Sequence, residues 1–171
     1  MSVMRSKSAR LQHGVSIVEA LVALLVLSIG MLGIAVMYLE SVRANRTALS
    51  RTQAIHLIND MADRIRSNRG ARAAYQLAIT DKKPTGATSC ATANCTPNAL
   101  AAYDIQEWAS AAIDTLPKGA NGTTLPKVRI TYAPGATSKD PSRYTIYAEW
   151  QDAGSEDLLS AELEFTQIGT T

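Results

Sequence analysis

The sequence predicts an α+β protein of lollipop form, in which one long N-terminal helix carries a small antiparallel β-sheet head. Three observations support this fold class. Residues 20–39 form one uncharged apolar run. Apolar residues then recur at helical spacing as far as Ile65, and from Lys127 onward apolar and polar residues alternate with the period of a strand. The period of the apolar pattern therefore changes from that of a helix to that of a strand at Lys127.

Composition narrows the classes of function. Hydrophobic residues make up 46% of the 171 residues and charged residues 19%, which is ordinary for a globular protein. Lysine and arginine total 17 against 15 acidic residues, so the net charge is +2 and a polybasic nucleic-acid-binding protein is excluded. Two cysteines are too few for a disulfide-dense miniprotein or a four-cysteine zinc site. No nucleic acid is expected as a partner.

The apolar run predicts a helix that inserts into a membrane. Ala20–Leu39 contains no charged residue, and at about 1.5 Å per residue it would span about 30 Å, the thickness of a bilayer hydrocarbon core. The alternative is a fully buried helix of a large domain, but too little chain remains to cover such a helix on all sides.

The segment before this run predicts the orientation of the chain. Residues 1–14 contain Arg5, Lys7 and Arg10 and no acidic residue. Positive flanks stay in the cytoplasm, so the C-terminal part is expected on the other side of the membrane. The run is longer than that of a secretory signal, and no small-x-small cleavage site follows it closely. A conventional cleaved signal is therefore disfavoured.

Glu19 is the only charged residue between Gly14 and Leu39, and it lies where the apolar run begins. A carboxylate in hydrocarbon costs about 2.5 kcal/mol or more at the bilayer centre unless it is paired. One interpretation is an acid at the membrane surface. The other is that the chain starts at Val15, so that Glu19 lies one helical turn from a free α-amine, its own or that of an adjacent subunit.

The stretch Gly14-Val15-Ser16-Ile17-Val18-Glu19, followed by the apolar run, resembles the class III signal of type IV prepilins and pseudopilins. The resemblance implies that prepilin peptidase cuts between Gly14 and Val15 on the cytoplasmic side of the membrane. It also implies that Val15 is N-methylated and that Glu19 guides the docking of subunits.

Further stretches resemble the minor pilins of the PilV family, the type IV pilus modification proteins. They are residues 43–46, 50–54 and 59–68, with later agreement at 107–108, 116–119, 144–146 and 150–152. The resemblance implies a minor pilin that assembles with other minor pilins and the major pilin. Such a pilin would help to prime the pilus at the inner-membrane assembly platform and would serve twitching motility. The resemblance leaves open whether it lies at or near the tip of the pilus.

The resemblance and the hydropathy pattern together divide the chain into four parts. Residues 1–14 are expected to be a cleaved cytoplasmic leader, and 15–40 the transmembrane and assembly half of the helix. Residues 41–69 are expected to be its amphipathic half, and 70–171 a periplasmic head with the α/β-roll of the family. Before assembly the protein would span the inner membrane once, and afterwards it would lie in the pilus at the cell surface.

The long helix is expected to run from about residue 16 to 68, a length of about 80 Å. Asp60 with Arg64, and Asp63 with Arg66, have the spacing of ion pairs on one helix, and we interpret them as a solvated helix face. Asn68-Arg69-Gly70 is a stop signal.

The remainder of the chain predicts a loop region, a second helix and three strands. Residues 71–102 read as loop with a short helical turn. Residues 103–116 predict a helix that Asp104 caps, with Trp108 in the core. Three half-buried strands, centred on residues 127–132, 144–150 and 161–166, predict an antiparallel meander with one face on the long helix.

Cys90 and Cys95 enclose four residues. In a periplasmic head a disulfide between them is the default. A metal site is disfavoured because two thiols are too few ligands and neither histidine is nearby in the sequence.

The sequence contains no catalytic constellation, because it lacks a nucleophile elbow, a phosphate-binding loop and a two-histidine zinc helix. No enzymatic activity, cofactor or metal is expected. Two other functions stay open. One is a minor pseudopilin of a type II secretion system, and the other is a single-pass anchored periplasmic binding domain that keeps its leader.

Overall fold

The computed structural model describes residues 14, 16–119, 122–137, 140–152 and 157–168. The chain forms two compact units, Met1–Arg43 and Ala44–Thr171. The predicted fold class is confirmed, because the chain contains a long N-terminal helix and a small antiparallel sheet.

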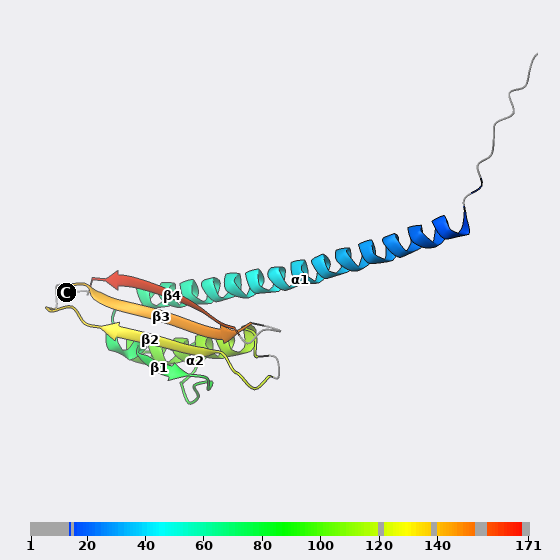
Figure 1. Cartoon of the computed structure of the whole chain (residues 1–171). Helices are drawn as coiled ribbons and strands as arrows, with labels where there is room; N and C mark the ends of the chain where they lie inside the picture. Colours follow the sequence, from blue (N-terminus) through cyan, green and yellow to red (C-terminus); the bar gives the residue numbers. More distant parts are fainter. Residues whose placement is uncertain (1–13, 15, 120–121, 138–139, 153–156, 169–171) are drawn as a thin grey trace, which may run out of the picture. The chain divides into compact units, whose positions relative to one another are not determined.

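Helix α1 extends over Ile17–Ser67 (Figure 1). It agrees with the predicted span to within one residue at each end. An acid in the first turn, Glu19, and arginines in the last turn, Arg64 and Arg66, complement the helix dipole. The helix contains no proline and therefore runs unbroken through the boundary between the two units.

The second unit contains the remaining elements around a four-stranded sheet in the order β1-β2-β3-β4. Every pair of neighbours is antiparallel, so the sheet is a simple meander (Figure 1). The elements are η1 (Arg72–Tyr75), β1 (Leu77–Thr80), α2 (Pro97–Thr115), β2 (Lys127–Ala133), β3 (Ser142–Gln151) and β4 (Leu158–Gln167).

One face of this sheet packs against α2 and against the part of α1 that belongs to the second unit, residues 44–67. Alternate residues of β2 and β3 point into the core, while polar residues between them lie on the other face. Small side chains on the helices allow close approach to this apolar face. The helices contribute Ala54, Ile58, Met61, Ala62, Ile65, Ala101, Ile105, Trp108, Ala109 and Ala112 to the core, and the sheet contributes Val128, Ile130, Tyr144, Ile146, Ala148 and Trp150. Leu116, which follows α2 directly, is also part of this core.

Trp108 fixes α2 to α1. Its side chain is 1% exposed, and its indole Nε1–H donates a hydrogen bond of 2.8 Å to the carbonyl oxygen of Leu57. The expected role of Trp108 as a core anchor is confirmed, and the hydrogen bond satisfies the one polar atom that the indole buries.

Two elements differ from the expectation for residues 71–102. The short turn is present as η1, but Leu77–Thr80 forms an edge strand, β1, against β2. Helix α2 begins at Pro97, with Thr96 as its N-cap, and not near residue 103. The Thr96 hydroxyl oxygen accepts a hydrogen bond from the Ala99 amide, and proline at the first helical position needs no amide partner. The predicted capping role of Asp104 is therefore wrong.

Candidate functional site: the N-terminal assembly segment

The assembly segment is defined as Gly14 to Leu39. Helix α1 begins inside it, where the Ala20 amide donates to the Ser16 carbonyl oxygen at 3.1 Å. Gly14 is exposed and lies before the helix, whereas Val15 lies outside the described residues. Cleavage between Gly14 and Val15 and methylation of Val15 therefore stay predictions.

Glu19 lies in the first turn of α1, and its side chain is exposed. The helix dipole favours a negative charge at this position. Among the residues that the structure describes, Glu19 has neither a hydrogen-bond partner nor an ion-pair partner. A group that neutralises this carboxylate in an apolar environment therefore has to be sought outside the described residues.

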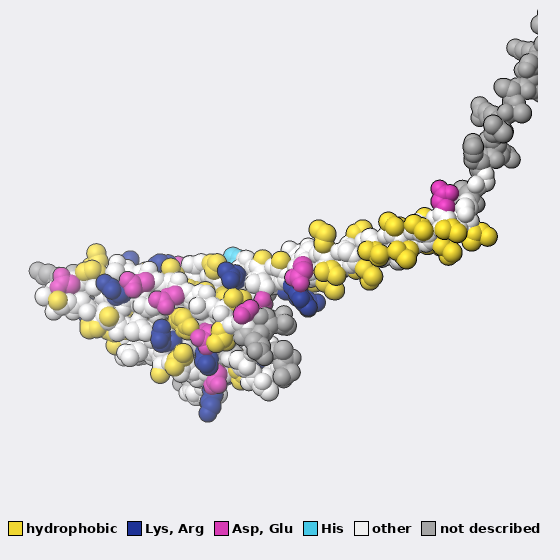
Figure 2. All heavy atoms as spheres, in the orientation of Figure 1, with side chains coloured by type: hydrophobic (Ala, Val, Ile, Leu, Met, Phe, Trp, Pro, Cys, Tyr) yellow, Lys and Arg dark blue, Asp and Glu magenta, His cyan; other side chains and the backbone are white. Residues whose placement is uncertain are grey.

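The side chains after Glu19 give α1 an apolar surface on every side. The most apolar 18-residue window of α1 has a mean hydropathy of 2.7, and none of it is buried within the chain. Figure 2 shows hydrophobic side chains covering this part of the helix, in contrast to the mixed charges over the head. By length and composition the helix is able to cross a membrane. An apolar surface of this kind needs lipid or other apolar helices around it.

The first charges after the apolar surface are paired with each other. Arg43 donates to Glu40 at 3.2 Å, and both side chains are more than two-thirds exposed. An exposed pair of this kind contributes little to stability. Glu40 and Glu19 are thus both acids on α1, but only Glu40 has a partner on its own helix among the described residues.

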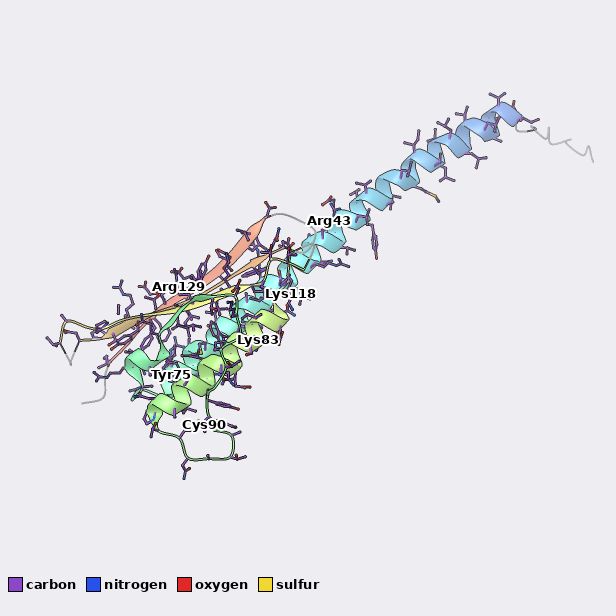
Figure 3. All side chains as sticks on the ribbon, turned by 90° about the horizontal axis from the view of Figure 1, so that it is seen from below. Arg43, Tyr75, Lys83, Cys90, Lys118 and Arg129 are labelled. Carbon is purple, nitrogen blue, oxygen red and sulfur yellow. A yellow bond between two sulfur atoms is a disulfide. The ribbon has the colours of Figure 1, made fainter. Side chains whose placement is uncertain are left out.

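A second polar cluster, absent from the predicted sites, lies in the head. Asp104 on α2 is 6% exposed and accepts hydrogen bonds from Arg64 at 3.0 Å and from the Tyr75 hydroxyl at 2.7 Å. Asn68 donates to the Tyr75 hydroxyl oxygen at 3.1 Å and to the carbonyl oxygen of Pro97 at 2.8 Å. Figure 3 shows Tyr75 on the short η1 segment beside α2.

This cluster joins the end of α1 to η1 and α2. Burial and the hydrogen bond to Asp104 raise the pKa of Tyr75 well above its usual value. Arg64 also binds Asp60 at 2.9 Å, so the predicted Asp60–Arg64 pair is present, as is the Asp63–Arg66 pair at 2.8 Å. The interpretation of this pattern as a solvated face is correct for Asp63 and Arg66. It is incomplete for Arg64, because the Arg64 guanidinium also forms an ion pair with the buried carboxylate of Asp104.

The disulfide expected between Cys90 and Cys95 is present, with the two Cα atoms 5.8 Å apart. It closes a small loop that precedes α2, where Figure 3 labels Cys90. Among the described residues there is no group of three or more histidine, cysteine and acidic side chains that could hold a metal ion.

Comparison with protein families identifies two adjoining matches. Residues 9–35 match the model of the prokaryotic N-terminal methylation motif. Residues 36–106 match the model of type IV pilin Tt1218. No curated protein and no solved structure matches the chain. The methylation motif covers the segment that carries Gly14 and Glu19, and the pilin model covers the rest of α1, the disulfide loop and Asp104. The two adjoining matches therefore support a type IV pilin.

Proposed function

We propose that the chain is a minor pilin of a type IV pilus, of the PilV kind. It would co-assemble with other minor pilins and the major pilin to prime the pilus at the inner-membrane assembly platform. The resemblance of residues 43–68 to the minor pilins supports this role, together with the match to a type IV pilin model. The observation that carries the proposal is the exposed apolar segment from Gly14 to Leu39, whose one acid, Glu19, has no partner among the described residues.

The proposed pathway begins in the inner membrane, with the leader, residues 1–14, in the cytoplasm and the head, residues 70–171, in the periplasm. Prepilin peptidase removes the leader after Gly14, and the new amine at Val15 is methylated. Residues 15–40 then leave the lipid and enter a bundle of similar helices, while residues 41–69 support the head. The apolar side chains exchange lipid for neighbouring helices, so this step changes their packing partners without exposing them to water.

Glu19 gives this bundle its register. The amine at the start of one subunit carries a positive charge, and the Glu19 carboxylate of a neighbour carries a negative charge. In a low-dielectric bundle the two charges attract strongly, and each removes the cost of burying the other. A subunit that is out of register would leave the carboxylate unpaired in an apolar environment, which is costly.

The test compares two acids on the same helix. Glu19→Ala is expected to leave cleavage intact and to lower incorporation into sheared pili about tenfold, because a partner for the neighbouring amine is lost. Immunoblots of sheared pili, normalised to the membrane pool, measure incorporation. Glu40→Ala is the matched control, because Glu40 follows the uncharged run and already pairs with Arg43 on the same helix. Equal incorporation of Glu19→Ala and Glu40→Ala would contradict the docking role.

A pseudopilin of a type II secretion system is the second candidate, because the N-terminal methylation motif and the exposed apolar helix fit both assemblies. Deletion of the gene discriminates between them. The proposed function predicts loss of surface fibres and twitching with normal enzyme secretion, and the pseudopilin predicts the reverse.

A further inference from the structure

Strand β4 (Leu158–Gln167) has a long open edge on one side of the sheet (Figure 1). It is an outermost strand of ten residues that pairs with β3 along its whole length. Among the described residues, no other backbone segment is hydrogen-bonded to it. The strand at the opposite edge, β1, has only four residues, and a short edge strand is one way in which proteins limit further pairing. The outer backbone groups of β4 are therefore a template for one more strand.

The inner face of β4 is only partly covered. Its inward side chains are Leu159, Ala161, Leu163 and Phe165, which pack against the core but stay half-buried. On the neighbouring strand β3 the corresponding side chains, such as Ile146 and Trp150, are buried. The difference follows from position, because β3 has a strand on each side and β4 has one on a single side. A strand added to β4 would supply the missing cover.

Helix α1 runs alongside this edge and adds to its apolar surface. Near the start of β4 the Thr47 hydroxyl donates to Asp152 at 2.6 Å, and near its end the guanidinium carbon of Arg66 lies 4.5 Å from the centroid of the Phe165 ring. Ile55 lies about three turns before Arg66 and thus on the same side of α1. Its side chain is 54% exposed. The helix therefore leaves an apolar side chain uncovered beside the half-buried row of β4.

The outer face of β4 carries the charge that selects a partner. Glu162 and Glu164 lie on this exposed face, and β4 contains no basic residue. Arg143 on β3 lies 3.4 Å from Glu164. Glu162 has neither a hydrogen-bond partner nor an ion-pair partner among the described residues. A basic side chain on an added strand would be directly opposite an acid that has no partner on the sheet.

The same glutamates disfavour a second copy of this chain as the occupant. Two β4 edges that pair with their apolar faces on the same side must run antiparallel. If they overlap along most of their length, glutamates at positions 162 and 164 lie opposite each other. Like charges directly opposite destabilise a sheet. The charge pattern therefore favours a strand of different sequence, with basic residues where β4 has acidic ones.

We infer that the β4 edge binds an extended segment of another protein, in which apolar residues alternate with lysine or arginine, as a fifth strand of the sheet. Backbone hydrogen bonds would supply affinity, and the alternating side chains would supply specificity. The apolar residues would cover Ile55 and Leu163, and a basic residue would pair with Glu162. The inference goes beyond the proposed function, because it concerns a surface of the second unit and does not use the assembly segment.

The test uses the full chain in detergent micelles with two synthetic peptides of about ten residues, the length of β4. In one peptide valine alternates with lysine, and in the other valine alternates with glutamate. NMR titration measures the affinity, and amide hydrogen exchange shows where each peptide binds. Glu162→Lys is the informative variant, because it reverses the unpaired charge at the edge. Glu107→Lys is the matched control, because Glu107 is an exposed glutamate on α2 that likewise has no partner among the described residues.

The expected result is saturable binding of the lysine peptide, with slower exchange at alternate amides of β4 and unchanged exchange at the amides that pair with β3. Glu162→Lys should weaken this binding about fivefold and strengthen binding of the glutamate peptide, whereas Glu107→Lys should change neither. Each of four results would overturn the inference. They are no saturable binding of the lysine peptide, binding that leaves exchange in β4 unchanged, equal effects of the two substitutions, and a dimer that protects the β4 amides without any peptide.

Discussion

Two parts of the same helix, one in each unit, have opposite environments. Before Arg43, large apolar side chains of α1 are exposed within the chain, as at Leu24 and Ile29, each 62% exposed. After Ala44, the apolar side chains of one face are buried, as at Ile58, 3% exposed, and Ile65, which is not exposed at all. The backbone is helical throughout, so the difference comes from the side chains and from what surrounds them.

This contrast shows that one helix can serve two kinds of packing. The first part is apolar on every side and has no packing partner among the described residues, so its stability depends on lipid or on other subunits. The second part has one apolar face and buries it against the sheet and α2, so its stability comes from the chain itself. Mutations in the two parts should consequently be detected by different measurements.

The sharpest comparison makes one substitution at two places on α1. Ile65→Ala should lower the free energy of unfolding of the head by about 2–5 kcal/mol, because it leaves a cavity in the core. Ile29→Ala should leave this free energy unchanged. Chemical denaturation of the full chain, followed by tryptophan fluorescence, measures the effect, because both tryptophans, Trp108 and Trp150, are buried in the head. A loss of head stability in Ile29→Ala would contradict the separation of the two units.

A second comparison separates the buried acid of the head from an exposed one. Asp104→Ala should cost about 2–3 kcal/mol, because the Tyr75 hydroxyl and Arg64 both lose a charged partner. Asp63→Ala removes an ion pair whose Asp63 side chain is 75% exposed, and it should cost less than about 1 kcal/mol. The same denaturation experiment compares the two variants. Equal losses would mean that the buried cluster is no more important than the surface pair.

Alkaline pH should lower the free energy of unfolding of the head by less than the two core substitutions above, and this effect should be confined to the head. Burial, reinforced by Tyr132, raises the pKa of Tyr144 to about 12. The folded head therefore keeps this proton while the unfolded chain, whose tyrosine pKa is about 10, releases it. The resulting stabilisation is complete below pH 10 and is lost as the pH rises from about 10 to about 12.

Tyr144→Phe tests this pH dependence. At neutral pH the variant should lose about 1 kcal/mol, because the hydrogen bond to the Arg72 carbonyl is removed. Between pH 10 and 12 its stability should fall less steeply than that of the wild type, because the phenylalanine ring has no proton to lose. Denaturation curves at a series of pH values measure both quantities, and equal slopes would show that Tyr144 does not titrate in this way.

Elements with a long periodic pattern are predictable from the sequence. The span of α1 follows from its uncharged run and the helical spacing that continues to Ile65, and β2, β3 and β4 follow from their alternation. Strand β1 has only four residues and the burial pattern of its side chains does not alternate, so it depends on β2 as a partner. The Thr96-Pro97 pair is a recognisable helix start, but proline is equally common in loops, so the expectation of a loop over 71–102 hides it.

The functional residues likewise divide into those that the sequence predicts and those that it does not. Glu19 stands out in the sequence because it is a lone charge beside an uncharged run, and the two cysteines stand out because they are the only ones. Asp104 is misleading in the sequence, because Glu107 follows it at the spacing of a helix-capping box and so predicts a helix start at the wrong residue. Its partner Arg64 lies 40 residues earlier in the sequence, and its other partner, Tyr75, lies 29 residues earlier. Pairing over such distances is determined by tertiary packing, and no local pattern predicts it.

In the proposed function, the assembly segment becomes able to dock only after the chain is cut behind Gly14. Mass spectrometry of the protein purified from its own cells measures the N-terminus directly. Gly14→Val is the matched variant, because no atom of the described residues lies within 4 Å of a Cβ added at Gly14, so a side chain there should disturb only the peptidase. We predict a wild-type chain that begins at N-methylated Val15 and a Gly14→Val chain that keeps the leader. A wild-type chain that retains Met1 to Gly14 would contradict the account and favour a single-pass anchored periplasmic domain.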